Sequence, residues 1–124
     1  MDQQDDLASK IERFAGLKKS YKPEAYGFVL ESLDFTVTQL KQPRHISGQE
    51  LLEGIREYAL KQYGPMARTV FEHWGVRETL DFGKIVFELV DVGLLRKREE
   101  DAIDDFKSVY DFEKAFDRKF EFFD

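Results

Sequence analysis

Cysteine is absent from this chain of 124 residues, which contains only two histidines and one tryptophan. Without cysteine the protein can form neither a disulfide nor a thiolate metal site, as is typical of a reducing compartment. The two histidines, His45 and His73, do not have the spacing of a metal-binding motif. No base–nucleophile pair and no pair of acids has a spacing typical of catalysis. We therefore expect no metal, no cofactor and no enzymatic activity.

Long hydrophobic runs are also missing. No apolar stretch approaches the roughly 20 residues that cross a bilayer, so we expect no membrane-spanning segment. The first residues, MDQQDDLASK, lack the basic and then apolar pattern of a secretory signal, and we expect a cytoplasmic protein. With 42% hydrophobic and 15% aromatic residues, the chain can bury a core, and we expect residues 1–124 to form one domain.

An excess of positive charge is missing too. The net charge is −6, and residues 99–124 account for all of it, with four basic and ten acidic side chains. Residues 1–98 are therefore neutral. A neutral body does not attract nucleic acid, and an acidic tail repels it.

Helical periodicity dominates the first 46 residues. Apolar side chains recur at helical spacing over residues 2–17. In KPEAYGFVLESLDFTVTQLKQP, Pro23 is placed to begin a second helix and Pro43 to follow its end. We interpret residues 1–46 as an N-terminal helical layer.

Residues 47–124 show helix signals followed by a basic and then an acidic segment. Ser47 and Glu50 form a capping-box pattern that predicts a helix over residues 48–63. A short helix and a turn, WGVRET, follow, with Thr79 expected to cap the next helix and Gly93 to end it. LLRKR and KSVY are then predicted to pair as a β-hairpin around EEDAIDDF, and Asp111 to cap a final helix. The predicted fold class is mainly α (α+β).

Two resemblances follow from these patterns. With WGVRET as the turn and ELVDVGLLRKR as the exit to a wing, residues 47–110 resemble a winged helix-turn-helix domain. The chain, and PRHISGQELLEGIREYALKQYGPMA in particular, also resembles a family of small uncharacterised bacterial proteins. That family has no assigned activity, so this second resemblance implies no mechanism and no functional residues.

A winged helix-turn-helix would imply DNA binding, but the predicted recognition helix has the wrong surface. Residues 77–91 carry four acidic and two basic side chains. The outward face of this helix would present Leu80, Lys84 and Phe87, which suit a protein surface better than a phosphate-lined groove. The alternative of a DNA-binding regulator therefore depends on Arg96 and Arg98, which would share one face of a wing strand, unless they pair with the acidic run that follows.

The leading interpretation is a non-enzymatic protein-interaction module, with a protein partner or a homodimer. Leu80, Lys84 and Phe87 are its expected surface. The acidic aromatic tail contributes Phe122 and Phe123, which are adjacent, so that one of them must point away from whatever the other covers.

A weaker alternative is a site for an anion or a small molecule at Arg44, His45 and Ser47. Arginine can clamp a carboxylate or a phosphate, histidine can transfer a proton, and the helix beginning at Ser47 offers free N–H groups. The competing interpretation is that Arg44 and His45 bond to nearby carbonyls while Ser47 only caps the helix.

Overall fold

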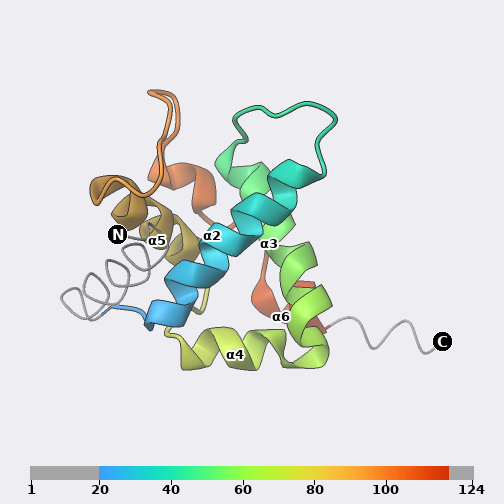
Figure 1. Cartoon of the computed structure of the whole chain (residues 1–124). Coiled ribbons are helices and arrows are strands. Elements are labelled where there is room, and N and C mark those ends of the chain that lie inside the picture. The colour runs from blue at the N-terminus through green and yellow to red at the C-terminus, as the bar shows by residue number, and fades with distance from the viewer. Residues whose placement is uncertain (1–19, 118–124) are drawn as a thin grey trace, which may run out of the picture.

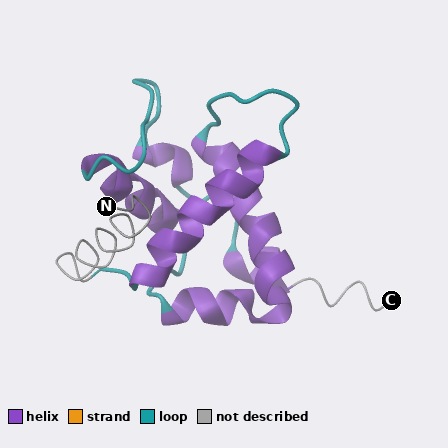
Figure 2. Cartoon of the chain, in the orientation of Figure 1, coloured by secondary structure: helices purple, strands orange, loops and turns teal. Residues whose placement is uncertain are grey.

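The computed structural model describes residues 20–117, which fold into helices joined by loops (Figure 1). The elements in chain order are α2 (Pro23–Thr38), α3 (Gly48–Tyr63), η1 (Gly64–Met66), α4 (Ala67–His73), α5 (Thr79–Asp91), η2 (Ile103–Phe106) and α6 (Phe112–Asp117). Between residues 20 and 117 there is no β-strand (Figure 2). The helix predicted over residues 2–17 and the tail residues Phe122 and Phe123 lie outside the described part.

The predicted α+β class, with its β-hairpin after α5, is therefore wrong, because residues 94–110 form turns and the short 3₁₀ helix η2. Carboxylates in the acidic run bond to nearby main-chain amides. Asp101 accepts from the Arg98 amide at 2.8 Å, and Asp105 from the Ala102 amide at 3.1 Å. Such local bonds compete with strand pairing. The helix-turn-helix order of α4 and α5 remains, but the wing of the winged-helix half does not form.

Several predicted helix boundaries are confirmed. Pro23 is the first residue of α2, and Ser47 and Glu50 form the predicted capping box at the start of α3. Gly93 follows the end of α5 with a φ of 83°, in the left-handed region that glycine adopts without strain. Asp111 accepts a bond from the Lys114 amide at the start of α6, at 3.1 Å.

The predicted capping role of Thr79 is wrong. Glu78 is the N-cap of α5, and the Thr79 side chain is buried. Its hydroxyl donates to the carbonyl of Phe106 at 2.6 Å and accepts from the amide of Val109 at 3.2 Å. Thr79 therefore holds the segment after η2 against α5.

The core is built from aromatic rings of both halves of the chain. Phe28 of α2 lies 5.4 Å from Phe71 of α4 and 6.5 Å from Phe82 of α5, measured between ring centroids. Phe71 in turn lies 5.7 Å from Phe112 and 5.2 Å from Phe116 of α6. Edge-to-face and tilted pairs at these distances stabilise a core beyond simple burial. The first and the last described helices, α2 and α6, thus share one hydrophobic cluster.

Phe106 is held in a slot between α3 and α5, and its side chain is 3% exposed. A Cβ at Gly48 of α3 would lie 2.8 Å from the Phe106 ring, and one at Gly83 of α5 would lie 2.7 Å from it. Two glycines therefore make the space for this ring. Because Phe106 is fixed here, the loop of residues 92–102 is anchored at both ends and rises beside the loop of residues 39–47 (Figure 1).

Candidate ligand-binding cavity

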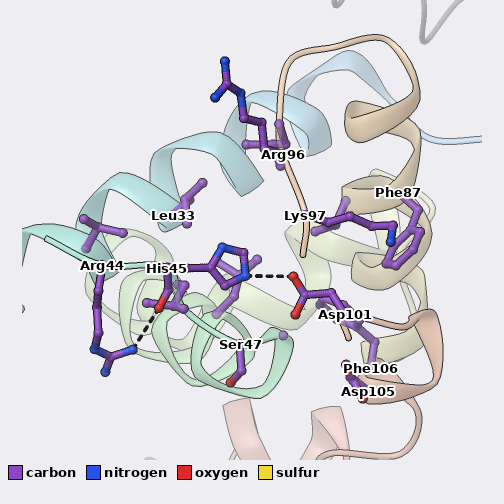
Figure 3. Close-up of a pocket in the computed structure, with 16 residues that line it drawn as sticks. Leu33, Arg44, His45, Ser47, Phe87, Arg96, Lys97, Asp101, Asp105 and Phe106 are labelled. Atoms are coloured by element: carbon purple, nitrogen blue, oxygen red, sulfur yellow. Dashed lines mark hydrogen bonds and ion pairs between the residues drawn. The ribbon is translucent and has the colours of Figure 1, made fainter. Parts of the chain in front are cut away.

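A cavity of about 240 Å³ lies between these two loops (Figure 3). The C-terminal half of α2 and the first turn of α3 form one wall, while α5 and the loop that follows it form the other. Its walls are mainly apolar, with side chains from Leu33, Val37, Ile46, Leu51, Val86, Phe87, Leu95 and Phe106. The polar lining residues are Arg44, His45, Ser47, Arg96, Lys97, Asp101 and Asp105.

A histidine–aspartate pair joins the two walls of the cavity. Nε2 of His45, from the loop before α3, lies 2.7 Å from Oδ2 of Asp101, from the loop after α5. The two side chains are 29% and 20% exposed. Partial burial opposes ionisation of Asp101, but the hydrogen bonds from the Arg98 amide and from His45 outweigh it and lower the pKa of this carboxyl. Asp101 is therefore a fixed anion that orients the imidazole.

Arg44 and Ser47 have structural partners of their own. The Arg44 guanidinium forms two hydrogen bonds to Glu50, at 2.8 and 3.1 Å, and a third to the carbonyl of His45 at 3.0 Å. Ser47 Oγ accepts from the Glu50 amide at 3.1 Å. The bonds from Arg44 and from the Ser47 amide lower the pKa of Glu50 to about 2. Of the three residues predicted to bind an anion, only His45 extends into the space between the loops (Figure 3).

Lys97 and Arg96 supply positive charge at the opening. Nζ of Lys97 lies 6.0 Å from the centroid of Phe87, over a ring that forms part of the apolar wall. It also donates to the carbonyl of Arg98 at 3.3 Å. Arg96 is exposed, and its guanidinium points away from the cavity (Figure 3). Lys97 is therefore the cation that lies against the apolar wall.

The predicted interaction surface on α5 is divided between different environments. Leu80 and Phe87 are half-buried against the core, and Lys84 is exposed. Phe87 lines the cavity, whereas Lys84 and Phe87 together line a second, more polar hollow of about 520 Å³. Two of the three carboxylates that line that hollow accept hydrogen bonds, Asp81 from Tyr21 at 2.6 Å and Glu88 from Tyr26 at 2.9 Å.

The two arginines predicted to contact nucleic acid do not share a strand face. Arg96 lines the cavity, while the main-chain amide of Arg98 donates to Asp101 and its side chain is exposed. The geometric reason for a basic wing is therefore missing. Binding of nucleic acid stays a prediction from the sequence.

Sequence reasoning missed Asp101 and Lys97 as parts of a site. Asp101 lies 56 residues after His45 and belongs to an acidic run that is typical of solvated surface. Nothing in the local pattern singles it out. The signal that the sequence does offer lies at His45, which stands between Arg44 and the helix start at Ser47 and could therefore mark the edge of a cavity.

Comparisons with protein-family models, with curated proteins and with solved structures find no match. Within residues 20–117, no cluster of three or more histidine, aspartate or glutamate side chains could hold a metal ion. In the same part of the chain, no helix is both long and apolar enough to span a membrane.

Proposed function

We propose that this protein binds a compact, mainly apolar small molecule in the cavity between the loops of residues 39–47 and 92–102. The observation that carries the proposal is an apolar cavity of about 240 Å³ with the His45–Asp101 pair at its opening. Binding sites for small molecules are typically concave and apolar, with a few polar groups that fix orientation. The proposal adopts the weaker of the sequence-based alternatives, with Asp101 and Lys97 in the place of Arg44 and Ser47.

The expected affinity is modest. Small ligands gain a net of about 0.3 to 1.5 kcal/mol per non-hydrogen atom, so a ligand of about seven such atoms that gains about 0.6 kcal/mol per atom binds with about 4 kcal/mol. A ligand of that size would bind with a dissociation constant of about 1 mM, and polar contacts at the opening would tighten it.

Hexanol is a suitable first probe, because it carries a six-carbon chain and no charge. In an NMR titration of the full chain, amide signals from both loops and from the adjoining turns of α2 and α5 should shift together. Val37→Phe places a ring in the cavity and should abolish these shifts. Val70→Phe is the matched control, because Val70 is also a half-buried helical valine but does not line the cavity. Absence of localised shifts in the unmodified protein would refute the proposal.

A second candidate is self-association through the outer face of α5, as the sequence predicted. The observation that favours it is that Leu80 and Phe87 are only half-buried, beside the exposed Lys84, so apolar surface remains accessible on this helix. The occupant we propose is a second copy of the chain. Light scattering coupled to size-exclusion chromatography measures the mass of the eluting species and so shows whether the chain forms a dimer.

A further inference from the structure

We infer that the molecule bound in this cavity is an amphipathic anion, such as an alkyl or aryl carboxylate, whose charged group is held by Lys97. This inference rests on the proposed function and names the ligand class. It follows from two observations: among the described residues Lys97 forms no ion pair, and its ammonium lies over the apolar wall.

Most charged groups at the opening already have a counterpart. Arg44 forms an ion pair with Glu50, and the Asp101 carboxylate is engaged by the His45 imidazole and by the Arg98 amide. Asp105 accepts a hydrogen bond from the Ala102 amide. Within the described part of the chain, no carboxylate forms an ion pair with Arg96 or Lys97. Among the described residues, Lys97 is therefore the cation at the opening that remains available to a ligand, because the Arg96 guanidinium points away from the cavity (Figure 3).

Lys97 stands at the boundary between the apolar wall and solvent. An ammonium group has three donors, and one of them is used by the Arg98 carbonyl. The position of Nζ over the Phe87 ring places the remaining donors beside the wall formed by Phe87 and Val86. A chain lying along this wall would bring an anionic end group within reach of the ammonium. A cationic end group on the same wall would meet repulsion from Lys97.

The charge of the ligand can be tested with hexanoate, hexanol and hexylammonium, which share one chain length. Isothermal titration or NMR titration of the full chain should show hexanoate binding about tenfold tighter than hexanol, with hexylammonium the weakest. Lys97→Met keeps the aliphatic part of the side chain over Phe87 and removes the charge. This variant should bind hexanoate five- to tenfold more weakly and bind hexanol with unchanged affinity. Lys97→Arg keeps the charge and should retain most of the affinity for hexanoate.

Lys61→Met is the matched control. Lys61 also lies over an aromatic ring, with Nζ 5.7 Å from the centroid of Phe35, but it does not line the cavity. This variant should bind hexanoate like the unmodified protein. If Lys97→Met does not fold, Lys97→Gln supplies a second test of the ammonium charge, with a similar expected loss of hexanoate affinity.

The outcomes separate this inference from the proposed function. If hexanol and hexanoate bind equally and Lys97→Met has no effect, the ligand class is wrong and the small-molecule site stands. If hexylammonium binds best, the sign of the charge is wrong. If none of the three probes shifts the loop signals, both the site and the ligand class are refuted.

Discussion

The space that Gly83 leaves for Phe106 shows how one missing side chain supports a distant segment. A Cβ at Gly83 would lie 2.7 Å from Cβ and Cγ of Phe106, the stiff base of that side chain rather than its flexible end. Phe106 cannot move away easily, because its carbonyl is held by Thr79. The close approach of α5 and η2 therefore depends on the absence of a side chain at this position.

Gly83→Ala should lower the free energy of unfolding by about 1–2 kcal/mol, since overpacking outweighs the higher helix propensity of alanine. Gly27→Ala is the control: a Cβ there would meet nothing within 4 Å, so the variant should be unchanged or more stable by up to about 1 kcal/mol. Urea denaturation followed by circular dichroism measures both. Equal effects of the two substitutions would contradict the slot described for Phe106.

At the residue scale, the sequence predicted which positions carry polar chemistry better than it predicted their partners. Ser47 and Glu50 were paired correctly, because their contact is local and follows from helix geometry. Thr79 was assigned to a local cap, but its partners lie 27 and 30 residues away. The Asp101 partner of His45 was missed for the same reason. Contacts of this range depend on how the helices pack, which no short pattern encodes.

At the scale of elements, the first turn of α3 joins a capping box to an ion pair. Glu50 accepts hydrogen bonds from the Ser47 amide and from Arg44, and its pKa falls to about 2 from the ordinary value of 4.5. Because the pKa is lower in the folded state, the charge on Glu50 contributes stability above pH 4.5. That contribution is lost as the pH falls toward 2.

Glu50→Gln keeps a side chain that can accept the capping bond but removes the charge that pairs with Arg44. At pH 6 the variant should be less stable by about 0.5–1 kcal/mol, a small effect because the Glu50 side chain is 42% exposed and solvent screens the pair. The difference should shrink between pH 4.5 and pH 2, as measured by urea denaturation. Glu57→Gln, at an exposed position on the same helix, should show no such pH-dependent difference.

The predicted elements between residues 20 and 93 agree with the structure, and those between residues 94 and 117 agree less well. Apolar periodicity and the proline, glycine and serine boundaries were sufficient for α2, α3 and α5. LLRKR and KSVY on either side of a polar run suggest two strands, but a two-stranded hairpin with no further strand to pair with is only marginally stable. Burial of Phe106 between two glycines and the local bonds of Asp101 and Asp105 favour turns instead.

At the scale of the whole molecule, the surface of the described part exposes few large apolar side chains. Only Met66 and Val92 are both large and exposed within residues 20–117. Self-association through α5 would therefore have to use the partly accessible surfaces of Leu80 and Phe87. The apolar area available for the predicted interface is therefore smaller than the sequence suggested. A substitution at Leu80 tests this area directly.

If α5 mediates a homodimer, the full chain should elute with twice the mass of one chain in light scattering. Leu80→Ser should then shift the mass toward that of a monomer. Leu60→Ser, which also changes a half-buried helical leucine but on α3, should leave the mass unchanged. A monomer at millimolar concentration of the unmodified protein would exclude this interface.

The fastening of residues 106–109 by the Thr79 hydroxyl has a consequence for how the molecule opens. One hydroxyl serves two main-chain groups, so both bonds break together when this segment leaves α5. Phe106 is also part of the cavity wall, so the same event removes one side of the binding site. Exchange of the Val109 amide proton with solvent would report this opening separately from global unfolding. A bound ligand that contacts Phe106 would slow that exchange. Ligand binding in the cavity and the local opening of residues 106–109 are therefore coupled.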